Sequence, residues 1–223
     1  MAGHIAVIDP GTRVPELDTF NRMSLRSRVP LTYHIVAQHG LDSLRSVADD
    51  TVAVVVLGSG ASVHDDLPWQ HALKEWLGER LQGGMPALGL CYGHQLFADL
   101  FGGTVGFLFD DRHKLRGLRR VELSGGDIWP RAAGELVVSH REAVMEVPDA
   151  FDVVATSPQV AVEAMAHTRF PIYGVQAHPE ATADFVQKNG IPVALRPGVF
   201  DFGHTLVDAF LDQVADLHGT ATG

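Results

Sequence analysis

Short apolar runs with strand character mark the first half of the chain. Residues 5–9 and 31–37 have this character, and residues 51–57 are almost wholly apolar and rich in valine. A run this uniformly apolar is typical of a strand covered on both faces, as in a parallel sheet. The Gly58-Ser59-Gly60 turn closes the third run. Three strands are therefore predicted, the third of them fully buried.

Large apolar side chains then recur at helical spacing over residues 69–81. We expect a helix there, with Pro68 in its first turn and Asp65 or Asp66 as its cap. Its two tryptophans are expected to anchor the core. Residues 85–90 return to strand character. Strands and helices thus alternate along this half of the chain.

The remaining pattern completes an α/β fold. A helix is expected over residues 95–101, whereas residues 105–123 and 135–165 contain short alternating strands and charged turns. Residues 172–176 form another strand, and residues 203–218 close the chain as an amphipathic helix. The alternation predicts right-handed crossovers. We therefore predict a mostly parallel central sheet flanked by helices, with an antiparallel extension from the middle of the chain.

Composition narrows the class of protein. The 223 residues are 46% hydrophobic, and this length favours a single domain over residues 1–223. Twenty-seven acidic against 17 basic residues give a formal charge of −10, which argues against nucleic-acid and membrane partners. The amino terminus has no basic leader and no run approaches the ~20 apolar residues of a membrane span, so we expect a cytoplasmic protein.

Cys91 is the only cysteine, and it lies in a Gly-x-Cys-x-Gly sequence between a predicted strand and a predicted helix. Two flanking glycines permit the sharp strand-to-helix corner called a nucleophile elbow. The sulfur would then lie at a helix amino terminus, where the helix dipole favours a thiolate. Lone cysteines are more often buried and inert. The two glycines and the strand-to-helix setting favour a nucleophile here.

A base for this cysteine is available in the His178-Pro179-Glu180 sequence. Proline disfavours the helical conformation of the residue before it, so His178 should be extended. Residues two apart on an extended segment project to the same side, which places Glu180 beside the imidazole. A carboxylate in that position fixes the tautomer of the base and stabilises its positive charge. By itself the tripeptide is weak evidence, but it follows a strand of the same predicted sheet as Cys91.

Attack by sulfur on a carbonyl also requires donors for the resulting oxyanion. The backbone N–H of Tyr92, directly after the nucleophile, is one candidate. The glycine-rich turn at residues 58–62 follows the most hydrophobic strand, so its amide groups can face the same crevice. An ordinary turn is the alternative interpretation of that segment.

Four sequence blocks together resemble a known family. They are residues 57–60, 89–95, 139–144 and 174–180, and their order and spacing are similar to those of the class I (triad-type) glutamine amidotransferase domain over nearly the whole chain. Among its branches, the chain looks most like stand-alone proteins akin to the glutaminase domain of GMP synthase, which include γ-glutamyl peptidases. The stretch at residues 62–69 particularly suggests that branch.

The resemblance implies a flavodoxin-like class I amidotransferase fold and a set of site residues. A triad of Cys91, His178 and Glu180 is implied, with the N–H groups of Ser59 and Tyr92 at the oxyanion. It also implies that Gln95 and the Ser139-His140 segment help to hold a glutamine-like substrate, and we add Gly58, Gly60 and Arg141 as further candidate substrate-binding residues.

Two positions depart from the pattern of the family. Many members have a Gly-Gly-Pro type of turn where this chain has Gly58-Ser59-Gly60, but a backbone donor survives a serine side chain. Arg141 stands where members have glycine or another small or acidic residue. Its guanidinium either pairs with the α-carboxylate of a glutamyl group or faces solvent.

Neither a metal nor a cofactor is expected. Although the chain has 12 histidines, pairs such as His34 and His39 or His64 and His71 show no ligand pattern with cysteine or acidic partners. The mixed-charge stretch at residues 110–114 is interpreted as a solvated loop.

The expected reaction is hydrolysis of the γ-carboxamide of glutamine through a thioester on Cys91, with release of ammonia. The chain has no room for an acceptor domain, so either a separate synthetase subunit receives the ammonia or the protein is a free-standing hydrolase of glutamine or γ-glutamyl peptides. One rival is the wider group of cysteine-elbow proteins, in which histidine commonly follows the cysteine at once. Another is a non-catalytic binding or regulatory protein on the same fold.

Overall fold

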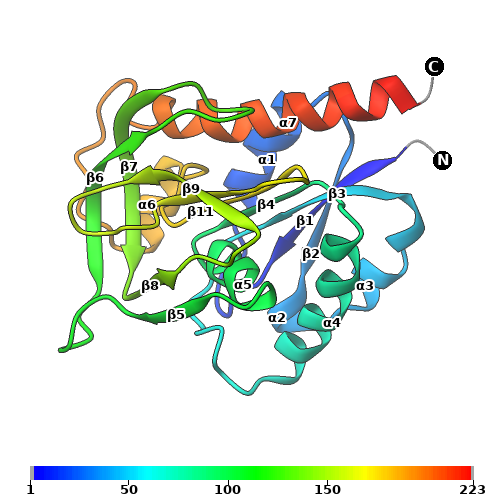
Figure 1. The fold of residues 1–223 in the computed structure, drawn as a ribbon, viewed down its shortest axis with the longest axis horizontal. Helices are drawn as coiled ribbons and strands as arrows, with labels where there is room; N and C mark the ends of the chain where they lie inside the picture. Colours follow the sequence, from blue (N-terminus) through cyan, green and yellow to red (C-terminus); the bar gives the residue numbers. More distant parts are fainter. Residues whose placement is uncertain (1–2, 222–223) are drawn as a thin grey trace.

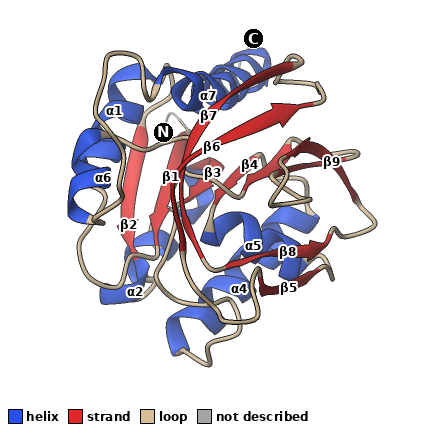
Figure 2. Cartoon of the chain, turned by 90° about the vertical axis from the view of Figure 1, so that its left-hand side faces the viewer, coloured by secondary structure: helices blue, strands red, loops and turns tan. Residues whose placement is uncertain are grey.

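A computed structural model describes residues 3–221 of the chain. Helices cover both faces of one large twisted sheet, and the long final helix runs along one side of the molecule (Figure 1). A view turned by 90° shows the sheet between two groups of helices, with a small two-stranded ribbon beside it (Figure 2). The arrangement is a three-layer α/β sandwich.

The elements differ in length and kind along the chain. The strands are β1 (His4–Asp9), β2 (Leu31–Ile35), β3 (Thr51–Val56), β4 (Ala87–Leu90), β5 (Thr104–Phe107), β6 (Leu115–Leu123), β7 (Ala132–His140), β8 (Glu142–Glu146), β9 (Phe151–Thr156), β10 (Ala164–His167) and β11 (Ile172–Val175). The helices are α1 (Leu17–Arg26), α2 (Val36–His39), α3 (Asp42–Arg45), the 3₁₀ turn η1 (Ala48–Asp50), α4 (Pro68–Gln82), α5 (Tyr92–Leu100), α6 (Ala183–Lys188) and α7 (Asp201–Ala221).

The main sheet confirms the predicted fold class. Its nine strands run in the order β2-β1-β3-β4-β11-β10-β9-β6-β7, and a second sheet pairs β5 with β8. Strands β2, β1, β3, β4 and β11 are parallel, as expected for strands joined by helical crossovers. The remaining four strands extend the sheet in the antiparallel sense.

Two apolar cores, one on each face, hold the layers together. On one face, side chains of α1 and α7 pack on the sheet, with Met23, Val207 and Phe210 almost fully buried. On the other face, α4 and α5 supply Leu77, Phe97 and their neighbours. The central strands are therefore covered on both sides, which explains why β3 is apolar at nearly every position.

The turn between β4 and α5 is a sharp corner at Cys91. This residue has φ 51° and ψ −95°, a conformation that non-glycine residues rarely adopt. A Cβ on Gly89 would lie 2.5 Å from the backbone of Gly93, and one on Gly93 would lie 2.3 Å from the carbonyl oxygen of Val56. The corner therefore exists because both flanking residues lack a side chain.

The antiparallel strands curl back toward the end of the parallel ones. Strands β6 and β7 pair over nine residues, from Leu115 opposite His140 to Leu123 opposite Ala132. An isolated bridge then joins Val137 of β7 to His178, which lies just beyond the end of β11. This curl carries the end of β7 over the carboxyl ends of β4 and β11.

The cap expected for α4 is wrong. Leu67 is the N-cap, and no side chain caps the helix. Pro68 forces the preceding residue into an extended conformation, so the chain enters the helix at Leu67. Asp65 instead accepts the N–H of Ser62 at 2.9 Å in the turn before the helix, and Asp66 pairs with a histidine of α4.

Several boundaries also differ from the sequence prediction. Helix α5 begins at Tyr92 rather than at residue 95, because Gly93 belongs to its first turn. The run at residues 31–37 divides into β2 and the short α2. Helix α1 was not predicted, although it is amphipathic; only Thr19 and Met23 of its ten residues are buried.

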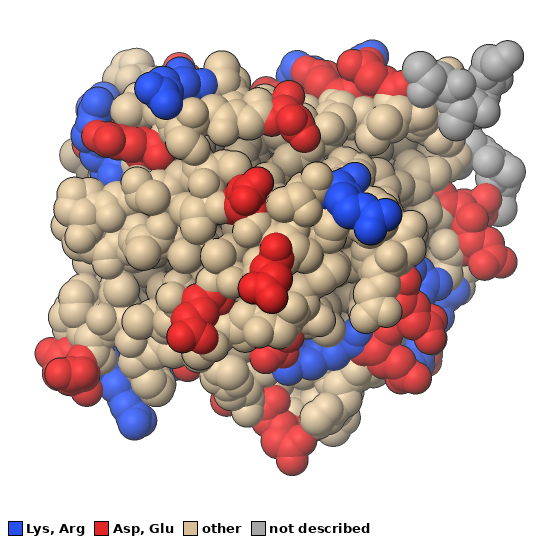
Figure 3. Space-filling model, viewed as in Figure 1, with Lys and Arg blue, Asp and Glu red and all other residues tan. Residues whose placement is uncertain are grey.

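Charged side chains are distributed over the surface. Acidic and basic residues are interspersed on the face shown in Figure 3. Within residues 3–221, none of the helices combines the length and apolarity needed to cross a lipid bilayer.

Gly93→Ala should destabilise the protein by about 1–3 kcal/mol, because its Cβ would overlap the carbonyl of Val56 in a close-packed region. Chemical denaturation measures the change. Gly78→Ala is the matched control: it also lies in a helix, but its Cβ would meet only Leu100, at 3.9 Å. That variant should gain roughly 0.5–1 kcal/mol. Equal effects of the two substitutions would contradict the steric account of the corner.

Candidate active site

The sulfur of Cys91 lies at the amino terminus of α5 and is almost buried, since the residue is 5% exposed. The Cys91 N–H donates to the carbonyl of Val175 at 2.8 Å, which continues the pairing of β4 with β11. The first N–H groups of a helix lack partners within the helix, and its dipole favours negative charge there. The corner therefore presents the thiol where a thiolate is stabilised.

His178 and Glu180 lie together just after β11. Nδ1 of His178 is 2.9 Å from Oε1 of Glu180, and the residues are 5% and 3% exposed. The His178 N–H donates to the carbonyl of Val137 at 2.8 Å, and its ring packs on Phe185 with 4.6 Å between centroids. Because Nδ1 binds Glu180, Nε2 is the nitrogen left to exchange a proton with another group.

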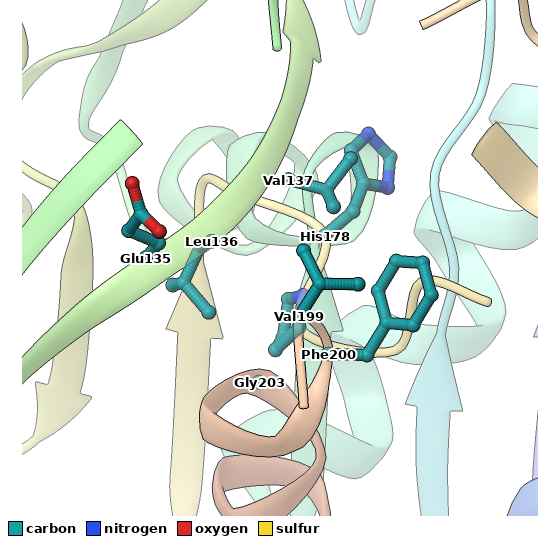
Figure 4. A pocket seen from close by; sticks show the side chains of 8 residues that line it. Glu135, Leu136, Val137, His178, Val199, Phe200 and Gly203 are labelled. Atoms are coloured by element: carbon teal, nitrogen blue, oxygen red, sulfur yellow. The ribbon is translucent and has the colours of Figure 1, made fainter. Parts of the chain in front are cut away.

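A shallow pocket lies behind the His178 backbone. It is lined by residues of β7, the 178–179 segment and the start of α7, among them Val137, Val199, Phe200 and Gly203. Figure 4 shows the imidazole pointing away from Gly203. The residues that line this pocket therefore lie against the backbone of His178, and the imidazole is not directed toward Gly203.

The charge state of His178 reflects its neighbours. Burial disfavours the imidazolium, but a thiolate at Cys91 and the Glu180 carboxylate outweigh it and raise the pKa of His178 from 6.5 to about 10. The imidazolium is therefore the favoured form of His178 beside a Cys91 thiolate.

Gly58 lies against both Cys91 and His178. A Cβ on Gly58 would lie 2.8 Å from Cε1 of His178 and 3.7 Å from Cβ of Cys91. The turn after β3 therefore lies against both residues. Any side chain at this position would displace the imidazole.

The N–H groups expected at the oxyanion lie on this turn and on α5. Oγ of Ser59 donates to the carbonyl of Pro10 at 2.7 Å and accepts the N–H of Ala61 at 3.1 Å. Among the described residues, no acceptor is found for the Ser59 N–H itself. Tyr92 is the first residue of α5, so its N–H has no partner within the helix. Gly60 is exposed, beside Thr12.

Two buried amides link the nucleophile to the end of β7. Nε2 of Gln95 donates to the carbonyl of Glu142 at 2.7 Å and to Oε1 of Gln176 at 3.2 Å. Nε2 of Gln176 in turn lies 3.9 Å from Sγ of Cys91. Sequence reasoning included Gln95 but missed Gln176. The available signal was a polar residue directly after an apolar strand, two positions before His178.

The segment predicted to bind substrate borders the same place. Ser139 and His140 are buried, whereas Arg141 is exposed. Lys114 lies close enough to Cys91 to interact electrostatically: burial and the cations Arg116 and Arg141 lower its pKa, while a Cys91 thiolate opposes this shift. The stretch at residues 110–114 is exposed, as expected for a loop, and its last residue lies within electrostatic range of Cys91.

Sequence reasoning also missed a buried ion pair, Arg119 with Glu163. Arg119 shares the inner face of β6 with the apolar residues Val121 and Leu123, so the period-2 pattern of this strand was the signal. No group of three or more histidine, cysteine, aspartate or glutamate residues among residues 3–221 is arranged to hold a metal ion.

Comparison with known proteins identifies the family. Residues 23–189 match the family model described as glutamine amidotransferase class-I. The chain belongs to this family.

Curated relatives include GMP synthase proteins. A GMP synthase subunit of Methanopyrus kandleri, named as glutamine-hydrolyzing, is 44% identical over 105 residues, which cover 46% of this chain and 55% of that protein. The GMP synthase of Mycobacterium leprae is 33% identical over 180 residues, covering 79% of this chain and 31% of that protein. The chain thus spans about half the length of the GMP synthase subunits that it matches.

Solved structures show the same fold. A GMP synthase subunit from Thermoplasma acidophilum superposes with a TM-score of 0.74 at 20% identity, covering 100% of this chain and 99% of that one. A glutamine amidotransferase of Methylobacillus flagellatus gives a TM-score of 0.69 at 19% identity, covering 96% and 93%. Both agree with the sheet and helix arrangement described above.

His178 should be doubly protonated at pH 8, because its pKa is raised to about 10 and protonation is lost only as the pH rises through that value. Nitrogen-15 chemical shifts of the imidazole report this state. In Cys91→Ala the thiolate is absent, burial dominates, and His178 should be neutral at pH 8. His140 serves as the internal control and should be neutral in both proteins. A neutral His178 in the wild type would contradict the ion pair.

Proposed function

We propose that this protein hydrolyses the γ-carboxamide of glutamine to glutamate and ammonia, with Cys91 as nucleophile. The observation that carries the proposal is the convergence of Cys91, His178 and Gly58 at the carboxyl ends of β4, β11 and β3, with Glu180 behind the imidazole. This arrangement supplies a nucleophile, an oriented base and backbone donors together.

In the first half of the reaction, the thiolate of Cys91 attacks the side-chain carbonyl carbon of glutamine and forms a C–S bond. The carbonyl oxygen becomes an oxyanion that accepts hydrogen bonds from the N–H groups of Ser59 and Tyr92. Nε2 of the His178 imidazolium then protonates the amide nitrogen, the C–N bond breaks, and ammonia leaves. Glu180 keeps the ring oriented throughout.

The second half hydrolyses the γ-glutamyl thioester. Neutral His178 takes a proton from water through Nε2, and the hydroxide adds to the thioester carbonyl at the same oxyanion position. Collapse of this intermediate breaks the C–S bond, releases glutamate and regenerates the thiolate beside the imidazolium.

Substrate binding is assigned to groups around this centre. Gln95 and the Ser139-His140 segment border the nucleophile. Gly58 and Gly60 add no side chains on either side of Ser59. Arg141, which lies near Lys114 at the exposed edge, is proposed to pair with the α-carboxylate of the glutamyl group.

We propose glutamine rather than γ-glutamyl peptides as the substrate, because the curated relatives are named as glutamine-hydrolyzing. Those relatives are subunits by name, so we propose that a separate synthetase subunit receives the ammonia. The γ-glutamyl peptide hydrolase remains the second candidate, because the same triad acts on the carbonyl group that both substrates share.

Cys91→Ala should lower ammonia release from glutamine by at least about a thousandfold, because no other group can form the thioester. A coupled glutamate dehydrogenase assay measures the rate, and circular dichroism of the variant checks folding. A panel of γ-glutamyl peptides assayed in parallel separates the two candidate substrates. Ammonia release that persists unchanged in the variant would remove the covalent mechanism.

Arg141→Ala should raise KM for glutamine about tenfold and change kcat little, as expected for loss of a charge-assisted hydrogen bond of about 1.5 kcal/mol made equally in the ground and transition states. Steady-state kinetics provide both constants. Arg169→Ala is the matched control, since Arg169 is exposed before the start of β11, at the opposite end of that strand from the site. An unchanged KM in Arg141→Ala assigns the guanidinium to solvent.

A further inference from the structure

A buried ion pair lies behind the substrate-binding segment. Arg119 of β6 donates from Nη2 to Oε2 of Glu163 at 2.7 Å, and its Nε lies 2.5 Å from Oε1. Their side chains are 5% and 0% exposed. Burial lowers the pKa of Arg119 and raises that of Glu163, while each charge opposes the shift of the other. Such a pair is costly to desolvate and adds little stability over apolar residues.

The remaining end of the guanidinium contacts His140. Nη1 of Arg119 lies 3.1 Å from Nε2 of His140. A guanidinium can only donate, so Nε2 must accept and the ring proton must reside on Nδ1. Nδ1 accordingly donates to the carbonyl of Glu142 at 2.9 Å. Burial, assisted by the charge of Arg119, lowers the pKa of His140 to about 3, so the ring is neutral.

The carbonyl of Glu142 is shared with the active site. It also accepts from Nε2 of Gln95 at 2.7 Å, and Gln95 contacts Gln176, whose amide faces the sulfur of Cys91. The backbone closes the network, because the N–H of Gln176 donates to the carbonyl of Glu163 at 2.8 Å. One continuous set of hydrogen bonds therefore runs from the ion pair to the nucleophile.

We propose that Arg119 and Glu163 are positioning residues, whose ion pair fixes His140 as the Nδ1–H tautomer and thereby orients residues 139–142 and Gln95 for substrate binding. The inference deepens the proposed function and rests on it. With an apolar pair in place of the charges, Nε2 could keep the proton, and the lone pair of Nδ1 would then face the carbonyl of Glu142 and repel it. The segment would shift, and with it the amide of Gln95.

The pair acts on substrate binding rather than on the reactivity of the thiolate. Arg119 lies within electrostatic range of Cys91, but the opposite charge of Glu163 contacts its guanidinium at 2.5–2.7 Å, so the ion pair as a unit changes the field at the sulfur little. The side chains that contact the sulfur are His178 and the amide of Gln176, and Lys114 acts on it only through its charge. Loss of the ion pair should therefore raise KM and leave the nucleophile reactive.

The test is the double variant Arg119→Met/Glu163→Leu, in which apolar side chains fill the site without an unpaired charge. It should melt within a few degrees of the wild type, raise KM for glutamine about tenfold, and keep kcat and the rate of Cys91 alkylation by iodoacetamide within about twofold. Arg119→Lys retains a long cationic donor and should bring KM back to within about threefold. Arg120→Met, on the exposed face of β6, is the matched control and should leave KM unchanged.

A double-mutant cycle with His140→Asn tests the route of the effect. If Arg119 acts through His140, adding Arg119→Met/Glu163→Leu to His140→Asn should raise KM no further than His140→Asn alone does. A normal KM in the folded double variant, or an additive increase in the cycle, overturns the proposal.

The tautomer of His140 can be determined in the wild-type protein, without a variant and without an activity assay. Nitrogen-15 shifts of His140 in the wild type at pH 7 should show protonated Nδ1 and unprotonated Nε2. The opposite tautomer overturns the proposal even if the double variant does not fold. A wild type that shows the expected tautomer but no hydrolysis of glutamine would refute the proposed function and leave the ion pair as the group that fixes His140.

Discussion

The strained corner at Cys91 is the constraint on which the rest of the site depends. A non-glycine residue at φ 51° costs of order 1–3 kcal/mol, and it persists because the packing of α5 on β3 and β4 leaves the chain no other path. Gly89 and Gly93 permit that close packing. The corner places Cys91 at the carboxyl end of β4 and at the start of α5.

Convergence of distant segments follows from strand order. Strands β4 and β11 are neighbours and parallel, so their carboxyl ends bring Cys91 and His178 to one edge although 87 positions separate them in sequence. The curled β6–β7 hairpin then passes over that edge, and the bridge between Val137 and His178 fixes the position of β7 relative to the end of β11. The parallel half of the sheet thus supplies the reacting groups, and the antiparallel half supplies the segment at residues 139–142.

Local patterns predicted the strands of the parallel half, the corner and the His178-Pro179-Glu180 segment, because each depends on neighbouring residues. The cap of α4 and the start of α5 were not predicted correctly, since steric effects of single residues decide them, and the amphipathic pattern of α1 was missed. Arg119 and Glu163 are 44 positions apart, and only the fold pairs them. A charged residue on the apolar face of a strand signals burial, but its partner cannot be named from sequence.

Backbone and side-chain roles differ in the substitutions that they tolerate. The turn after β3 is proposed to contribute the N–H of Ser59, and because its hydroxyl donates to the carbonyl of Pro10, a serine is compatible with that proposed role. Gly58 is different, because any Cβ there would meet the imidazole of His178. Within a single turn, then, one position is free to vary and its neighbour is not. The segment beyond β7 differs in the same way, since Arg141 is exposed, while Arg119 and His140 are enclosed in a network that permits one arrangement of protons.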